Sequence, residues 1–212
     1  MRIEAYIDVM CPWCYIGKRR LETALAELPG RERVEVVWRS LELAPDSDRT
    51  PGPTAAEAMV RWRGAAAPAR VALIHETGAA EGLEIDLRKS RPVNTFDAHR
   101  LIKLGADAGR ADETLEVLYR AYHSEGLDIA DHGVLTALAA EAGLPAADAR
   151  AMLAGEAYGD AVRADESRAR ALGVQGVPTL VIGDAPPTGG VQPPATLRHL
   201  IERALRSRSA GA

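Results

Sequence analysis

Hydrophobic residues change their spacing along the chain, and each change predicts a different element. Apolar and polar residues alternate at 2–9, which predicts a strand because successive strand side chains point to opposite faces. From Leu21 the apolar residues recur every three or four positions, which predicts a helix that begins near Pro12 and ends at 29–30. β-branched residues at 33–39 predict a second strand. This order forms a βαβ unit, whose two strands are expected to be parallel.

The rest of the chain has a helical centre and a strand near its end. The segment 45–54 consists mainly of turn formers, and 54–172 is rich in alanine and helical in its spacing, without strand-like alternation. A short apolar run at 180–182 predicts a late strand, and the apolar spacing at 197–204 predicts a last helix. No segment repeats at a fixed period, so we do not expect a solenoid.

The order of sheet, helices and sheet predicts an α/β protein whose two outer segments join. We expect residues 1–50 and 173–212 to form the first and second parts of one domain, and residues 51–172 to form a large helical domain inserted into it. The acid-rich stretch 160–166 is predicted to be a solvated helix face, and Trp38 and Trp62 are predicted to pack in the core or between domains.

Composition and charge exclude several classes of function. The chain has 212 residues, with 26 Lys or Arg against 30 Asp or Glu and a net charge of −4. This balance gives no electrostatic footprint for nucleic acid or for a membrane surface, and no apolar run is long enough to span a membrane. The first residues have the pattern of a strand and lack the apolar segment of a signal peptide. We therefore expect a cytoplasmic protein that acts on small molecules or on other proteins.

Both cysteines of the chain lie within four residues, in the sequence CPWC at 11–14. Lasting disulfides are rare in the cytoplasm, so such a pair indicates redox, metal or nucleophilic chemistry. Cys11 is predicted where the first strand ends and the first helix begins, and the unpaired N–H groups and dipole of a helix start favour a thiolate. Pro12 suits the first helical turn. Cys14 lies on the same turn, where it can resolve a mixed disulfide formed at Cys11.

Segments spread over almost the whole chain resemble one family. They are DVMCPWCYIGK (8–18), VVWRSLELAP (36–45), PVNTFDAHRL (92–101), AYHSEGLDI (121–129) and LGVQGVPT (172–179). In these segments the chain resembles the DsbA-like thioredoxin-fold oxidoreductases, and among them the cytosolic FrnE-type branch. The resemblance implies a thioredoxin fold with a helical insertion. It also implies dithiol–disulfide exchange with Cys11 as nucleophile and Cys14 as resolving thiol.

The resemblance also implies a cis peptide bond between Val177 and Pro178, opposite the cysteines, where it presents an open backbone edge to substrate. Two departures from the branch concern this region. Thr179 follows the proline where the branch usually has an aromatic residue, and only 190–192 remains of the expected end of the last strand. We therefore expect a short final hairpin, with consequences for the nearby substrate groove.

Trp13 lies between the cysteines, where strongly oxidising relatives have a histidine. Without that imidazole we predict a reduction potential nearer to that of thioredoxin (~−270 mV) than to that of DsbA (~−120 mV). Trp13 is interpreted either as a partly exposed aromatic residue at a helix start or as a stacking surface for substrate. Asn94 and His99 are interpreted as a helix cap and a partly buried histidine, or as residues of a cleft above Cys11, and capping preferences favour the first.

The sequence predicts no metal site and no resident cofactor. A zinc site needs about four ligands, and the five histidines of the chain are too scattered to complete the CPWC pair. No glycine-rich nucleotide-binding pattern is present. The predicted partners are protein or small-molecule thiols and disulfides.

Two alternatives to a thiol–disulfide oxidoreductase or isomerase stay open. The same fold hosts glutathione-dependent enzymes, such as 2-hydroxychromene-2-carboxylate isomerases and kappa-class glutathione transferases, and glutathione would then be a co-substrate. Those enzymes need no resolving thiol, so Cys14 favours the oxidoreductase. The second alternative is a peptide-binding, chaperone-like module in which the CPWC is idle.

Overall fold

A four-stranded sheet in the order β2-β1-β3-β4 forms one part of the molecule. The structure is a computed structural model and describes residues 1–209. The strands are β1 (Arg2–Ile7), β2 (Glu35–Ser40), β3 (Thr179–Ile182) and β4 (Thr188–Gly189). Strand β1 pairs in parallel with β2 and antiparallel with β3, and β3 pairs antiparallel with β4. The α/β class, the parallel βαβ unit and the short final hairpin predicted from the sequence are confirmed.

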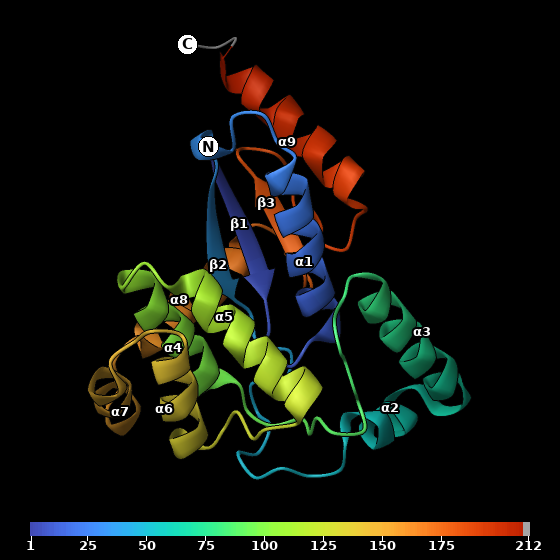
Figure 1. Cartoon of the computed structure of the whole chain (residues 1–212), viewed down its shortest axis with the longest axis vertical. Coiled ribbons are helices and arrows are strands. Elements are labelled where there is room, and N and C mark those ends of the chain that lie inside the picture. Colours follow the sequence, from blue (N-terminus) through green and yellow to red (C-terminus); the bar gives the residue numbers. More distant parts are fainter. Residues whose placement is uncertain (210–212) are drawn as a thin grey trace.

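Two long helices lie beside the sheet. Helix α1 (Pro12–Ala26) packs against α9 (Pro194–Ser209), and both lie along the strands in Figure 1. Pro12 occupies the first turn of α1, where its missing N–H leaves no intrahelical bond unmade. The helix ends at Ala26, a few residues before the predicted end at 29–30, and Glu27 and Leu28 close its last turn with backbone hydrogen bonds.

All elements between β2 and β3 are helical within the part of the chain that the structure describes. The helices are α2 (Ala55–Arg63), α3 (Ala67–Ala80), α4 (Phe96–Asp107), α5 (Ala111–Arg120), α6 (His132–Glu141), α7 (Ala146–Ala154) and α8 (Gly159–Ala171), and the short turns are η2 (Gly64–Ala66) and the π-helical η3 (Ala121–Glu125). A further short turn, η1 (Arg31–Arg33), lies between α1 and β2. Figure 1 shows α2 and α3 on one side of the start of α1 and α4 to α8 on the other. The division into domains at residues 50 and 172 stays a prediction, and residues 210–212 lie outside the described residues.

A buried carboxylate joins the helical segment to the sheet. Asp165 on α8 accepts hydrogen bonds from Arg39 Nη1 at 2.8 Å and from the backbone N of Ser40 at 2.9 Å, and it also pairs with Lys103 on α4. The prediction of a solvated face at 160–166 is wrong here, because Asp165 is only 3% exposed. Its partners come from β2 and α4, which are distant in sequence, so local charge patterning did not indicate them.

The two tryptophans predicted to pack in the interior behave differently. Trp38 on β2 is buried, as predicted, among the apolar side chains of the core. Trp62 on α2 is 60% exposed, so the prediction of a packed residue is wrong. It lies on the last turn of α2, a helix whose buried residues, Ala55 and Ala58, are both near its start, so the end of the helix that carries Trp62 faces solvent.

Candidate active site

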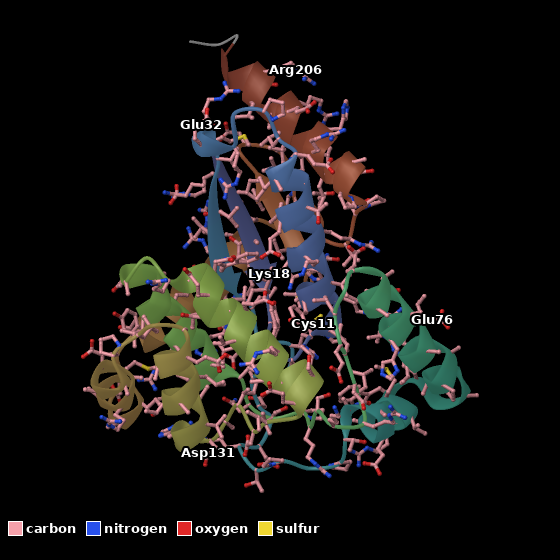
Figure 2. All side chains as sticks on the ribbon, in the orientation of Figure 1. Cys11, Lys18, Glu32, Glu76, Asp131 and Arg206 are labelled. Atoms are coloured by element: carbon pink, nitrogen blue, oxygen red, sulfur yellow. The ribbon has the colours of Figure 1, made fainter. Side chains whose placement is uncertain are left out.

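The two cysteines occupy the start of α1. Cys11 is the N-cap residue, and the backbone N–H of Cys14 donates to the Cys11 carbonyl at 3.0 Å. Both thiols are free, Cys11 is 5% exposed, and Cys14 is fully buried. Figure 2 shows Cys11 at the end of α1 that faces the inserted helices. Cys11 is therefore the outer sulfur and Cys14 the inner one, and both lie on the same helical turn.

The Val177–Pro178 segment lies against the outer cysteine. The peptide bond between Val177 and Pro178 is cis, and the Val177 carbonyl lies 4.0 Å from Cys11 Sγ. The backbone N–H of Gly190 donates to the Pro178 carbonyl at 2.8 Å, which fixes the loop from its other side. A Cβ at Gly190 would lie 2.9 Å from the Cβ of Pro178, so this close approach requires glycine. The structure thus brings Cys11, Val177 and Pro178 together.

Trp13 contributes an indole ring beside the dithiol. It is partly buried, and the guanidinium of Arg70 on α3 lies over its ring at 5.1 Å from the centroid. Its Nε1 is buried and has no hydrogen-bond partner among the described residues. Both interpretations of Trp13 stay open, because packing under Arg70 and contact with a substrate are compatible.

The carboxylate of Asp8 and the imidazole of His99 form a buried polar pair near the cysteines. Asp8 is fully buried and accepts hydrogen bonds from the backbone N–H groups of Met10 at 3.3 Å and Leu43 at 2.6 Å. Its Oδ1 lies 3.4 Å from His99 Nε2, without the geometry of a hydrogen bond. His99 is fully buried, which is more than the partial burial predicted for it.

Glu42 extends this buried polar cluster toward the surface. Burial raises the pKa of its carboxyl, against the opposing effects of His99 and of Arg163, whose Nη1 lies 2.6 Å from Glu42 Oε2. The other carboxylate oxygen of Glu42 has no partner among the described residues. The cluster of Asp8, His99 and Glu42 therefore holds unsatisfied polar atoms in the interior, next to the dithiol.

Asn94 stabilises the start of α4. Its Oδ1 accepts a hydrogen bond from the backbone N–H of Phe96 at 3.0 Å, and its Nδ2 donates to the Pro45 carbonyl at 2.9 Å. The N-cap residue itself is Thr95, so Asn94 acts from one position farther out than a cap would. Neither of its two side-chain hydrogen bonds involves the dithiol.

A group of aromatic residues from the inserted segment covers the inner cysteine, and the sequence analysis did not single it out. Tyr119 and His123 are both fully buried at the end of α5 and in η3. The Tyr119 ring stacks on Tyr15 of α1, with 5.0 Å between centroids and an interplanar angle of 21°. His123 Nε2 lies 3.0 Å from the carbonyl of Val9, two residues before Cys11. Tyr119 and His123 are four residues apart, as neighbours on one helix face are, but Tyr15 is distant in the sequence. The sequence therefore offered little signal that the three side chains meet.

Burial makes the two thiols unequal. Burial raises the pKa of Cys14 well above 9, and the neighbouring Cys11 thiol and Asp8 carboxylate act in the same direction. A hydrogen bond from the backbone of Asp8 favours the thiolate and opposes the shift. Cys14 thus stays protonated until a reaction step generates its thiolate.

Neutral His123 makes the stability of the fold sensitive to acid. Burial lowers the pKa of His123 from 6.5 to about 3. As the pH falls from 6.5 toward 3, the unfolded chain therefore binds a proton that the folded chain does not, and stability is lost. From this residue alone we expect a loss of about 1.4 kcal/mol per pH unit in that window, measured by urea unfolding.

The matched variants are His123→Gln and His199→Gln. Glutamine at 123 can still donate to the Val9 carbonyl but does not titrate, so the acid-dependent loss is expected to shrink. His199 is an exposed residue of α9, and its replacement is expected to leave the pH dependence unchanged. An equal pH dependence in the wild type and in His123→Gln would contradict the assignment of this loss to His123.

The described residues contain neither a metal-binding cluster nor a membrane-spanning helix. Among residues 1–209, no three His, Cys, Asp or Glu side chains are grouped in a way that could hold a metal ion. No helix in the same part of the chain is both long enough and apolar enough to cross a membrane.

Residues 2–202 match the family of DSBA-like thioredoxin domains. The chain belongs to this family. The fold predicted from the resemblance, a DsbA-like thioredoxin fold, is thereby confirmed. In this DSBA-like chain, Cys11 lies beside the Val177 carbonyl that precedes the cis proline. The helices between β2 and β3 face the same end of α1 (Figure 2).

Solved structures of similar proteins support the same fold. The chain is 38% identical to a probable DsbA oxidoreductase from Streptomyces coelicolor, with a TM-score of 0.91 over 97% of this chain and 90% of that one. It is 20% identical to the cytosolic disulfide reductase DsbM from Pseudomonas aeruginosa, solved with GSH, with a TM-score of 0.67 over 97% of this chain and 100% of that one. A 2-hydroxychromene-2-carboxylate isomerase is 16% identical, with a TM-score of 0.76 over 100% of both chains.

A curated relative extends the similarity without naming an activity. The uncharacterized protein YwbO of Bacillus subtilis is 27% identical over 208 residues, which cover 97% of this chain and 96% of the relative.

Proposed function

We propose that this DSBA-like protein is a thiol–disulfide oxidoreductase or isomerase that works in the cytoplasm through its CPWC dithiol. Cys11 is the nucleophile, Cys14 is the resolving thiol, and the Val177–Pro178 edge receives the substrate. Trp13 and Pro12 line the same edge. The substrates are thiols and disulfides of proteins or small molecules.

The observation that carries the proposal is the unequal burial of two free thiols on one helical turn. Cys11 is the N-cap residue of α1 and is the more exposed of the pair, whereas Cys14 is fully buried. An incoming disulfide can therefore meet Cys11 first, and only the intramolecular partner Cys14 can reach the mixed disulfide from inside. Val177 provides a backbone carbonyl beside Cys11, in position to pair with an extended substrate.

The alternative of a glutathione-dependent isomerase or transferase rests on the shared fold. A second, buried cysteine has no role in such an enzyme, which argues for the dithiol mechanism. Glutathione remains a candidate co-substrate of the dithiol mechanism, because it is a thiol that can reduce a Cys11–Cys14 disulfide.

The first experiment is a redox titration. The protein is equilibrated in thiol/disulfide buffers, its free thiols are trapped by alkylation, and its mass is measured. We expect a reversible Cys11–Cys14 disulfide with a potential nearer to ~−270 mV than to ~−120 mV. A potential on the oxidising side of their midpoint would contradict the predicted effect of Trp13.

Two other outcomes would overturn the proposed function. A chain whose oxidation stops at a glutathione adduct of Cys11 would favour the glutathione-dependent enzymes. A chain whose thiols neither pair nor react would favour a peptide-binding module. The double variant Cys11→Ser/Cys14→Ser is the control, and it is expected to show no mass change at any buffer potential.

A further inference from the structure

Tyr119 places a phenol in the interior next to the dithiol. The residue is fully buried near the end of α5, and its ring is held by the stack on Tyr15. Its hydroxyl has no hydrogen-bond partner of ordinary geometry among the described residues. A buried hydroxyl without a partner costs about 1–3 kcal/mol, so an orphaned phenol calls for an explanation.

The groups that act on this hydroxyl belong to the dithiol. Tyr119 stacks on Tyr15, the residue that follows Cys14, and Cys14, Cys11 and Asp8 all influence the ionisation of its hydroxyl. Together with burial, they raise the pKa of Tyr119 well above 10. The phenol therefore keeps its proton and remains a hydrogen-bond donor at any pH at which the protein works.

We propose that Tyr119 is a catalytic residue whose hydroxyl donates a hydrogen bond to the Cys14 sulfur when that sulfur carries negative charge. The inference rests on the proposed dithiol function. A neutral thiol is a weak acceptor and a thiolate a strong one, so the hydrogen bond strengthens as the charge develops. Such an interaction is stronger in the transition state than in the ground state, and it accelerates the step.

The step that Tyr119 assists is the resolution of the mixed disulfide. Cys14 releases its proton to water, its thiolate attacks Cys11 Sγ, the Cys11–Cys14 bond forms, and the bond between Cys11 and the substrate sulfur breaks. The substrate sulfur leaves with the electron pair as a thiolate and takes a proton from water. The protein dithiol is oxidised by two electrons and the substrate is reduced. In the reverse direction Cys14 is the leaving thiolate, and the same hydrogen bond stabilises it.

Cys14 needs such a donor because its surroundings disfavour charge. It is fully buried, and the Asp8 carboxylate and Cys11 also raise the pKa of its thiol. The backbone of Asp8 supplies one hydrogen bond that favours the thiolate. Tyr119 would supply a second, from the inserted helical segment, so this segment takes part in the chemistry as well as covering it.

The test compares Tyr119→Phe with Tyr122→Phe. Phenylalanine at 119 keeps the ring and its stack but removes the hydroxyl. Tyr122 is a buried phenol in the next turn that interacts with Ser90, so its variant controls for the loss of a buried hydroxyl. The reduced proteins are mixed with the chromogenic disulfide of 5-thio-2-nitrobenzoate, and the released thiolate is followed by stopped flow. Its first equivalent reports attack by Cys11 and its second reports resolution by Cys14.

Near pH 7 we expect Tyr119→Phe to slow the second phase about 10-fold and to leave the first phase within about twofold. The pH profile of the second phase is expected to shift to higher pH. Tyr122→Phe is expected to match the wild type in both phases. An unchanged second phase, equal slowing of both phases, or equal effects of the two variants would overturn the inference.

Two further arms keep the test decisive. If Tyr119→Phe does not fold, 3-fluorotyrosine is placed at 119, since it keeps the ring and hydroxyl and is a stronger donor. The second phase is then expected to accelerate, and an unchanged rate overturns the inference. A wild-type protein that never releases a second equivalent overturns the proposed function itself. A wild type that releases two, with variants that match it, overturns only the role of Tyr119.

Discussion

Replacing Cys14 with serine is expected to slow turnover severely and to trap substrate on Cys11. The serine variant keeps the outer nucleophile but removes the buried thiol that lies on the same helical turn. An external thiol at millimolar concentration must then replace an intramolecular one, so disulfide reduction is expected to slow roughly 10³-fold or more. Mass spectrometry of the acid-quenched reaction is expected to show one substrate thiol bound covalently to each chain.

The control for Cys14→Ser is Cys11→Ser, which is expected to form no adduct. Burial raises the pKa of Cys14 and leaves it a poor nucleophile toward an outside substrate. Full turnover by Cys14→Ser would contradict the dithiol mechanism and favour chemistry at a single cysteine. Adduct formation in Cys11→Ser would reverse the roles assigned to the two thiols.

Asp165→Asn is expected to cost about 3–5 kcal/mol of folding free energy, because it removes one anion from a buried charge cluster. Lys103 would then lose its carboxylate partner, and Arg39 would keep only Glu4. Burial already lowers the pKa of Lys103, and Asp165 opposes that shift. The measurement is urea unfolding at neutral pH, followed by circular dichroism.

Asp160→Asn is the matched control for this variant. Asp160 lies on the first turn of the same helix, α8, but is exposed, and its replacement is expected to change stability by less than about 1 kcal/mol. A comparable loss in both variants would point to the helix itself as the source. A loss below about 1 kcal/mol in Asp165→Asn would show that Arg39 and Lys103 are hydrated or rearrange.

The elements that carry local signals were predictable from the sequence. Strand alternation and helical spacing indicated β1, α1 and β2, and the βαβ order indicated that β1 and β2 are parallel. The late apolar run indicated β3, and the departure from the resembling branch near 190–192 indicated a short last hairpin. The family resemblance, rather than periodicity, supplied the cis peptide bond before Pro178.

The residues that the sequence analysis missed depend on contacts between distant segments. Asp165 has the local surroundings of an exposed helix face, and only its pairing with β2 and α4 explains its burial. Tyr119 was not singled out, because its stack on Tyr15 links residues that are far apart in the chain. Periodicity shows which face of a helix is buried, and it does not show what lies opposite.

The central position of β1 has a consequence for protein synthesis. One neighbour of β1 is β2, which follows it closely, and the other is β3, which comes from residues 179–182. A ribosome completes β1, the CPWC turn and β2 long before it reaches β3. Until then the nascent chain exposes an unpaired edge of β1, and Cys11 lacks the Val177 carbonyl that lies beside it in the finished fold. An open strand edge next to a free thiol is a site for mispairing, so the emerging chain is expected to depend on chaperones until β3 has been made and can pair with β1.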